Sequence, residues 1–289
     1  MTFNLTIPIA ALVAATAFCL SHPAAARAET RYLLADAYAQ ELDGLAVSFL
    51  ARDLETGDEF VLEGSDLDAR EAPWSTFKIP NLLIALETGV APSLDAWRDW
   101  DADRRPAAAH WPDGWKEGQT LKDAFARSSV WYFQDLALEI GGPAYRERLQ
   151  AWGYGNAKVP DGSDDFWLGS SLQISVREQV GFLETLLTGQ LGVSDGTLAA
   201  LDSASQVGAA SGVRLHGKTG SGPDDPANID GTFSGWYVGY LRREAQAPVV
   251  FALHVAAPSF TALRDFRRVF SGRLLEDAGL APAGLLDAG

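Results

Sequence analysis

The first 28 residues of the chain carry one uncharged apolar run, from Ile7 to Leu20. This run is shorter than the ~20 apolar residues that a membrane-spanning helix needs. It is followed by Ala26-Arg27-Ala28, and small residues at this spacing are typical of a signal-peptidase site. We therefore predict that residues 1–28 are a signal peptide cleaved before Glu29, rather than a buried N-terminal helix. No second run of this kind follows, so we expect a mature chain that is exported to the periplasm or the medium and carries no membrane anchor.

After this leader, the spacing of apolar residues predicts a group of elements that ends in an unusually apolar helix. The predicted elements are a helix over Leu33–Leu42, strands over Leu45–Arg52 and Glu59–Leu62, and a helix over about Thr76–Glu87. The last helix is apolar on most sides, which is typical of a central buried helix. Pro80 has no amide hydrogen and cannot donate to the Thr76 carbonyl, so this helix should begin irregularly.

The middle of the chain, Leu94–Leu201, is helical and rich in loops, without a convincing strand. Strands return after it, and an amphipathic helix closes the chain. The predicted elements are helices over Leu121–Ile140 and Val176–Leu187, strands over Val213–His216, Phe233–Leu241 and Val249–Ala256, and a last helix over Phe260–Ala278 with Phe266, Val269, Phe270 and Leu274 turned inward.

Strands at both ends of the chain around a helical middle predict an α+β fold with one discontinuous sheet. We expect a single domain over residues 29–289. Its sheet part should cover about 29–75 and 212–280, and its helical part about 76–211. A cleft between the two parts is the natural place for a site.

Composition narrows the kinds of function. Of 289 residues, 47% are apolar and 21% charged, which are globular proportions. With 38 acidic against 23 basic residues the net charge is −15, so we expect no nucleic-acid partner. A single cysteine excludes a disulfide scaffold, and four scattered histidines argue against a metal site.

Candidate chemistry begins at Ser75-Thr76-Phe77-Lys78, at the start of the apolar helix. Residues three apart on one turn bring a serine hydroxyl and a lysine amine together, and helix N-terminal amides are free nearby. A capping serine and a surface lysine would give the same pattern. The apolar residues that follow Lys78 favour a buried lysine instead.

A second motif, Lys218-Thr219-Gly220, comes at the end of the strand over Val213–His216, before a loop from Ser221 to Gly231. A lysine, a hydroxyl and a glycine there would place a cation at the cleft edge and let a ligand approach the backbone. The motif contains one of only five lysines in the chain, and Lys78 is another. Two weaker patterns lie between the motifs: Ser128-Ser129-Val130 and Tyr154-Gly155-Asn156.

In this order the motifs resemble one family, the class D serine β-lactamases. The residues that carry the resemblance are Pro73 to Asn81, Ala85 to Val90, Ser128-x-Val130, Tyr154-Gly155-Asn156, Phe166-Trp167-Leu168, Lys218-Thr219-Gly220 and Gly235 to Tyr240. The resemblance spans about residues 45–275. It implies the serine β-lactamase and penicillin-binding transpeptidase fold and the hydrolysis of β-lactam antibiotics. Trp131 stands where some members have proline, and Ser221-Gly222 lacks an aromatic residue found in others, which leaves the preference among penicillins, oxacillins and carbapenems open.

Acyl transfer needs an activated nucleophile, and no histidine partner is apparent. Ser75 is the expected nucleophile and Lys78 its base, as a neutral amine or in a modified form. The resemblance implies that Lys78 becomes N6-carboxylysine by reaction with CO₂, with no other cofactor. It also implies that Trp167 donates to that group and that Ser128 passes the proton to the leaving nitrogen.

Further roles concern the substrate. The resemblance implies an oxyanion hole formed by the backbone N–H groups of Ser75 and Ser221. The residues expected to bind the substrate are Lys218, Thr219, Gly220, Arg264, Val130 and Tyr154. Arg268 and Arg267 adjoin the expected arginine, so a solvated helix face is its alternative.

Two other functions share these motifs. A β-lactam-sensing receptor domain is acylated and stays acylated, but such receptors have a multi-helix membrane anchor. A D-Ala-D-Ala transpeptidase or carboxypeptidase usually lacks the Phe166-Trp167-Leu168 segment. The sequence favours a hydrolase, as a monomer or a homodimer.

Overall fold

The computed structural model describes residues 1–2, 28–169, 171–225, 228 and 231–285. Most of the predicted signal peptide lies outside the described residues. A seven-stranded sheet forms the centre, in the order β1-β3-β2-β11-β10-β9-β8. Neighbouring strands are antiparallel except for the parallel pair β1 and β3. The strands are β1 (Thr30–Leu33), β2 (Ala46–Asp53), β3 (Glu59–Leu62), β8 (Gln206–Ala210), β9 (Val213–Pro223), β10 (Phe233–Arg243) and β11 (Val249–Ala257).

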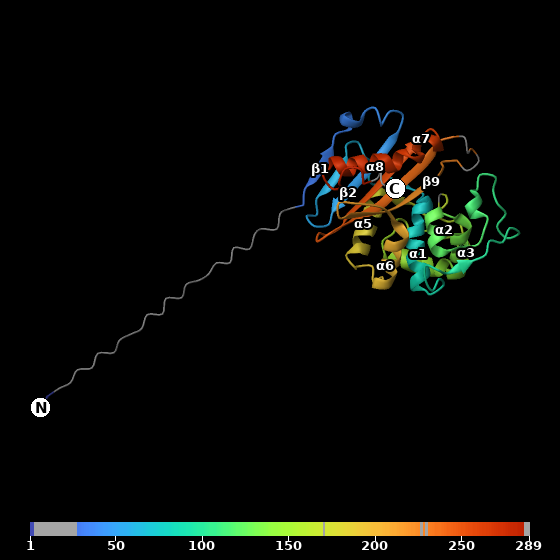
Figure 1. Cartoon of the computed structure of the whole chain (residues 1–289), viewed down its shortest axis with the longest axis horizontal. Coiled ribbons are helices and arrows are strands. Elements are labelled where there is room, and N and C mark those ends of the chain that lie inside the picture. Colours follow the sequence, from blue (N-terminus) through green and yellow to red (C-terminus); the bar gives the residue numbers. More distant parts are fainter. Residues whose placement is uncertain (3–27, 170, 226–227, 229–230, 286–289) are drawn as a thin grey trace.

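Helices cover both faces of the sheet (Figure 1). One face carries α8, and the other carries the larger helical part (Figure 1). On β10, Trp236 and Val238 belong to the core shared with the helical part, while Tyr237 faces the core under α8. The helices are α1 (Lys78–Glu87), α2 (Leu121–Arg127), α3 (Val130–Ile140), α4 (Gly142–Ala151), α5 (Val176–Leu187), α6 (Asp195–Ser205), α7 (Phe260–Arg264) and α8 (Phe266–Asp277).

Short elements connect these parts. Three 3₁₀ turns are η1 (Ala35–Tyr38), η2 (Trp74–Phe77) and η3 (Asp113–Trp115). Two-residue strands pair as β4 (Arg70–Glu71) with β7 (Ile174–Ser175) and as β5 (Trp97–Arg98) with β6 (Gln119–Thr120). The predicted α+β fold is confirmed. The helical middle nevertheless holds three of these short strands, which the apolar pattern is too brief to indicate.

The predicted helix over Leu33–Leu42 is wrong. Thr30–Leu33 instead pairs with β3, and only one 3₁₀ turn follows it. Of the residues at helical spacing, Tyr38 is buried, but Leu34 is 61% exposed. Backbone pairing with β3 accounts for Leu33, and the helical spacing after it gives only the 3₁₀ turn η1.

Two predicted long helices are each divided. The helix expected over Leu121–Ile140 breaks at Ser128, whose φ of 62° is left-handed, so α2 ends there and α3 begins two residues later. The helix expected over Phe260–Ala278 breaks at Asp265. Val269, which was expected to face inward, is 63% exposed. Spacing alone locates the helical turns but does not show where the axis changes direction.

Candidate active site

Ser75 lies in η2, where the chain leaves the sheet part and enters α1. The preceding Trp74 has a left-handed φ of 49°, which is strained for a residue with a side chain. Its backbone N–H donates to the Trp167 carbonyl at 3.1 Å, and its indole packs directly over Gly222. The irregular first turn that Pro80 predicts is confirmed, because η2 precedes the regular helix. The strained turn presents the Ser75 hydroxyl at the edge of β9.

Lys78 is wholly buried, with no exposed surface. Its Nζ lies 3.0 Å from Ser75 Oγ and 5.2 Å from the centre of the Phe133 ring. Burial, followed by repulsion from Lys218, holds the pKa of Lys78 well below its usual value. Because both causes disfavour the cation, the amine is prepared to be neutral and to accept a proton.

The motif Lys218-Thr219-Gly220 lies in the middle of β9, since the strand runs on to Pro223. The expected strand end and loop at this place are therefore wrong. Pairing with β10 continues through Ser221 and Gly222 and extends the strand. A Cβ on Gly220 would come within 3.0 Å of Ser75 N and 2.8 Å of the Pro73 carbonyl. Only glycine allows β9 to lie this close to the nucleophile turn.

Lys218 brings a second buried cation to the site, with only 6% of its surface exposed. Its Nζ donates to the Thr219 carbonyl at 3.2 Å and lies 5.8 Å from the centre of the Phe125 ring. Burial and repulsion from Arg267 lower the pKa of Lys218 to about 7. A bound anion would reverse this shift by stabilising the ammonium.

The structure brings Arg267, and not Arg264, to this strand. Arg264 is exposed at the end of α7 and donates to the Asp265 carboxylate at 3.0 Å. Arg267 is 7% exposed, and its Nη1 donates to the Gly220 carbonyl at 2.9 Å. Burial lowers its pKa to about 10. The position of Arg264 therefore does not support its predicted role, and of the adjoining arginines Arg267 is the one that reaches β9, at the Gly220 carbonyl.

Ser128 and Val130 lie at the break between α2 and α3, and both are partly buried. The neighbouring Ser129 is wholly buried and donates to Gln119 Oε1 at 2.8 Å. Of the two adjacent serines, Ser129 thus has a structural hydrogen bond inside the core. Ser128 occupies the left-handed turn itself and is the serine that the sequence singled out.

Trp167 is wholly buried and stacks on Phe77 with ring centres 5.2 Å apart. Its Nε1 has no hydrogen-bond partner among the described residues, although a buried indole N–H normally has one. This unpaired N–H lies next to the turn that carries Ser75 and Lys78. It could donate a hydrogen bond to an acceptor oxygen, which an unmodified lysine does not have.

Tyr154 does not reach a substrate position. It has no exposed surface and packs edge-to-face against Phe77 at 5.9 Å and Phe182 at 5.0 Å. Its predicted substrate contact is therefore wrong, since its ring lies inside the core beneath the nucleophile turn. Gly155 explains the rest of that motif, because a Cβ there would lie 2.1 Å from the Gln173 carbonyl.

One residue near Lys78 was missed from the sequence, and Arg267 was named there only as a neighbour of Arg264. Phe133 gave no signal beyond an apolar position, because only the packing of α3 against α1 brings its ring to Lys78. Arg267 did have a signal, as one of two adjacent arginines close to Arg264, but helical spacing alone did not separate it from Arg264.

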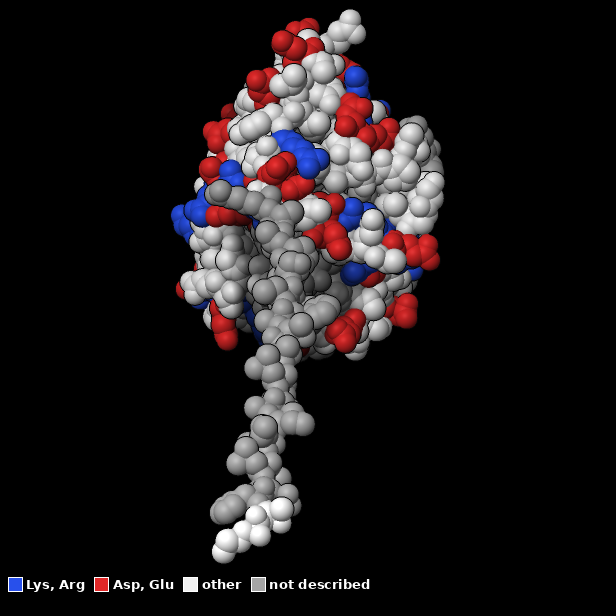
Figure 2. Space-filling model, turned by 90° about the vertical axis from the view of Figure 1, so that its left-hand side faces the viewer, with Lys and Arg blue, Asp and Glu red and all other residues white. Residues whose placement is uncertain are grey.

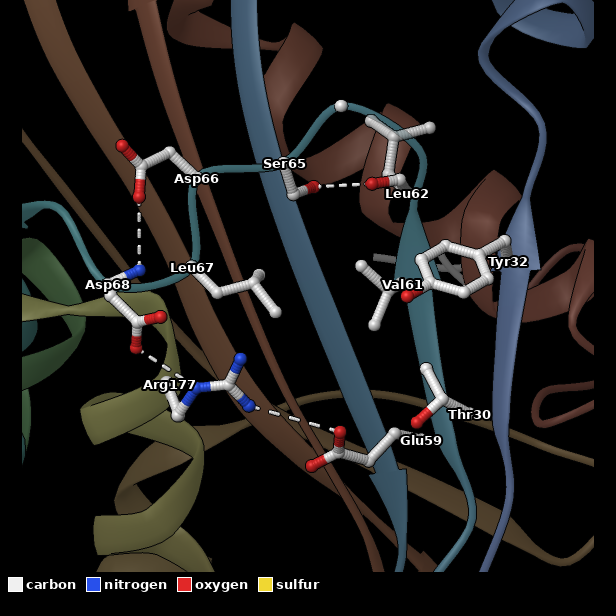
Figure 3. Close-up of a pocket in the computed structure, with 11 residues that line it drawn as sticks. Thr30, Tyr32, Glu59, Val61, Leu62, Ser65, Asp66, Leu67, Asp68 and Arg177 are labelled. Carbon is white, nitrogen blue, oxygen red and sulfur yellow. Dashed lines mark hydrogen bonds and ion pairs between the residues drawn. The ribbon is translucent and has the colours of Figure 1, made fainter.

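A groove elsewhere on the surface has a volume of about 490 Å³. It lies between β3 and the start of α5 (Figure 3). Arg177 there pairs with Asp68 at 3.0 Å and with Glu59 at 3.9 Å, so its guanidinium already has carboxylate partners within the groove (Figure 3). None of the predicted catalytic residues lines it, and it is separate from the candidate site.

The charges on the surface follow the acidic balance of the sequence. Figure 2 shows acidic groups scattered over the visible face with basic groups between them, and no continuous basic patch on that face. Among the described residues, no cluster of three His, Cys, Asp or Glu side chains is arranged to hold a metal ion. The described helices are also too short or too polar to cross a bilayer.

Comparisons with known proteins agree on one family. The sequence model for the penicillin binding protein transpeptidase domain matches residues 48–271. The chain is 33% identical over 198 residues to probable beta-lactamase YbxI of Bacillus subtilis, covering 68% of this chain and 70% of that protein. It is also 33% identical over 209 residues to beta-lactamase OXA-10 of Pseudomonas aeruginosa, covering 72% of this chain and 75% of that protein.

Solved structures are similar over more of the chain. A class D beta-lactamase from Sebaldella termitidis superposes with a TM-score of 0.78 at 26% identity, covering 88% of this chain and 99% of the other. The C-terminal domain of the Bacillus licheniformis BlaR penicillin-receptor also has a TM-score of 0.78, at 25% identity, covering 88% of this chain and 98% of the other.

Proposed function

The chain belongs to the class D serine β-lactamases, and on this premise we propose that it hydrolyses β-lactam antibiotics through an acyl-enzyme on Ser75, with carboxylated Lys78 as the general base. The observation that carries the proposal is a wholly buried lysine whose Nζ lies 3.0 Å from Ser75 Oγ. We further propose that penicillins and oxacillin-type compounds are substrates and that the activity confers antibiotic resistance.

Acylation forms a bond between Ser75 Oγ and the lactam carbonyl carbon and breaks the ring C–N bond. The Ser75 proton passes to the base, and Ser128 delivers a proton to the leaving nitrogen. The backbone N–H groups of Ser75 and Ser221 stabilise the oxyanion, each contributing ~3–4 kcal/mol in comparable sites. Gly220 supports this arrangement, since its lack of a side chain lets the strand that carries Ser221 approach Ser75.

The surroundings of Lys78 fit a carboxyl group on its amine. Carboxylation by CO₂ requires a neutral amine, which burial favours. Trp167 Nε1 is a buried donor without a partner among the described residues, and a carboxylate oxygen would satisfy it. When present, this group supplies an anionic oxygen base in place of an amine nitrogen.

The substrate carboxylate would bind at β9. Lys218 and Thr219 lie on β9, and the buried Arg267 of α8 reaches the carbonyl of Gly220 on the same strand. Both cations have depressed pKa values because of their burial, so an incoming carboxylate would stabilise their charged forms.

Turnover of a chromogenic cephalosporin tests the proposal. Residues 29–289 should hydrolyse nitrocefin, lose activity on dialysis against CO₂-free buffer at mild acid pH, and regain it on addition of bicarbonate. Ser75→Ala should abolish turnover without changing the circular dichroism spectrum. A wild-type rate that ignores bicarbonate, together with no ¹³C carbamate resonance, would refute the carboxylated base.

A receptor function is the second candidate, because the similarity to the BlaR penicillin-receptor domain is as close in TM-score as that to the β-lactamase. A receptor would accumulate one stable covalent adduct per chain, whereas an enzyme would turn over many substrate molecules. Mass spectrometry one hour after mixing with a tenfold excess of penicillin distinguishes the two.

We also propose that residues 1–28 are removed and that the mature protein is periplasmic or secreted. The support is the uncharged run followed by Ala26-Arg27-Ala28. The intact mass of the exported protein should correspond to a chain starting at Glu29. A retained leader or an added lipid mass would contradict this.

A further inference from the structure

Arg105 lies at the centre of a buried ion-pair network outside the residues assigned to catalysis. Its side chain is only 13% exposed, and it meets two carboxylates from different parts of the chain. Arg105 Nη1 lies 2.6 Å from Asp164 Oδ2, and its Nε donates to Asp135 Oδ1 at 3.0 Å. The Trp100 indole fixes the backbone at this place by donating to the Arg105 carbonyl at 2.9 Å.

One carboxylate connects Arg105 to Trp167. Asp164 precedes Trp167 by three residues, in a segment that follows α4 without a helix or strand of its own. The Trp167 carbonyl accepts the Trp74 N–H at 3.1 Å, so this segment also supports the strained turn at the nucleophile. The ion pair with Arg105 fixes the segment at Asp164, three residues before Trp167. Both side chains of the pair are largely buried.

The other carboxylate connects Arg105 to the helix that brings Phe133 to Lys78. Asp135 is on α3, two residues after Phe133, whose ring lies 5.2 Å from Lys78 Nζ. One guanidinium therefore links the element that supplies Phe133 to the segment that supplies Trp167. A planar guanidinium can bind two carboxylates at fixed angles, which a lysine ammonium does less well.

We propose that Arg105 is a positioning residue that holds α3, which carries Phe133, to the segment that carries Trp167, and thereby sets the affinity of Lys78 for CO₂. The inference rests on the proposed carboxylation of Lys78. Without the Arg105 link, the Trp167 segment and α3 are free to separate. Water then reaches the amine and favours its protonation, and Trp167 Nε1 loses its fixed position. Both effects weaken the carbamate without removing any group that touches the substrate.

The test measures carbamate occupancy directly. Arg105→Gln, Asp164→Asn and the double variant are titrated with ¹³C-bicarbonate, and the carbamate resonance is followed by NMR. Each single variant should need roughly tenfold more bicarbonate for half occupancy, the lower end of the loss seen when supporting partners of a site are removed. The double variant should be no worse than Arg105→Gln, because both changes break the same link. Saturating bicarbonate should restore most of kcat, which it would not do for a globally destabilised protein.

Arg98→Gln is the matched control. Arg98 is a comparably buried arginine (18% of its side chain exposed) that pairs with Glu139 on the same helix α3, and no ion pair joins it to the described residues of the Trp167 segment. Its loss should leave the bicarbonate midpoint within about twofold. Arg105→Lys should fall between wild type and Arg105→Gln.

The outcomes separate the two proposals. A wild type without any carbamate overturns both the carboxylated base and the role of Arg105. A wild-type carbamate whose bicarbonate midpoint is unchanged in Arg105→Gln and Asp164→Asn overturns only the role of Arg105. If Arg105→Gln does not fold, Asp164→Asn decides the question, because it leaves the pair between Arg105 and Asp135 in place.

Discussion

Three buried basic side chains give the site its chemical character at the scale of single residues. Lys78, Lys218 and Arg267 each have less than a tenth of their surface exposed. Burial comes first among the causes that depress their pKa values, and repulsion from a neighbouring cation adds to it. Burying these basic groups together disfavours their charged forms, so a carboxylate on Lys78 or on the substrate would stabilise the charged forms of Lys218 and Arg267.

Arg267→Ala should raise the KM for penicillin substrates and lower kcat/KM by about 10- to 100-fold, as expected for a lost charge-assisted hydrogen bond. The reason is that Arg267 is the buried arginine that reaches the Gly220 carbonyl. Arg264→Ala is the control and should stay within about twofold of wild type, since its guanidinium is exposed and pairs with Asp265. Steady-state kinetics with benzylpenicillin measures both, and the reverse order of effects would restore Arg264 to the substrate site.

At the scale of elements, the site depends on one close approach between η2 and β9. The two come together at Gly220, where the backbone of the strand meets the backbone of the nucleophile turn. The indole of Trp74 over Gly222 closes the same interface two residues further along the strand. Glycine at both strand positions is therefore a packing requirement, not a matter of flexibility.

Gly220→Ala should lower kcat/KM for nitrocefin by about 100-fold or more, because a shift of about 1 Å in a catalytic group has this effect. Its new Cβ would clash with backbone atoms of Pro73 and Ser75, which cannot rotate away. Gly181→Ala is the control: it lies in α5 with open space around the position, and alanine favours a helix. That variant should keep full activity and stability. An active Gly220→Ala would show that η2 and β9 are less tightly fixed than the structure indicates.

At the scale of the whole molecule, the sheet is buried on both faces, with an apolar core on each side. A histidine lies within one of these layers. His254 on β11 accepts or donates a hydrogen bond with Ser234 Oγ at 2.7 Å and lies 4.6 Å from the Trp236 ring. Burial lowers its pKa to about 4. The folded protein therefore holds this histidine neutral at pH values where an unfolded chain would protonate it.

This difference predicts a loss of stability in acid. Between pH 6.5 and about 4 the unfolded chain binds one proton more at this site than the folded chain, so the free energy of unfolding should fall as the pH falls through this window. The contribution is at most about 3 kcal/mol. Urea unfolding at pH 7 and pH 4.5 should show a smaller decrease for His254→Asn than for wild type. His110→Asn, at an exposed position, should behave like wild type.

The sequence by itself determined the fold class and the close approach of Ser75 and Lys78 at the irregular start of α1. The evidence for them is local: Ser75 and Lys78 are three residues apart, an apolar sequence follows Lys78, and Lys218 is followed two residues later by Gly220. Local spacing is enough for Ser75 and Lys78 because they are only three residues apart, on either side of the junction of η2 and α1.

Only the tertiary structure decided which arginine faces β9, that Tyr154 is buried and that Phe133 lies against Lys78. Each of these depends on where a helix breaks or how two elements pack. Helical spacing shows which side chains share one face of a helix, but it does not show which element that face packs against. The strand at Thr30–Leu33 shows the same limit, because its partner β3 lies almost 30 residues away and supplies the hydrogen bonds that the local pattern cannot reveal.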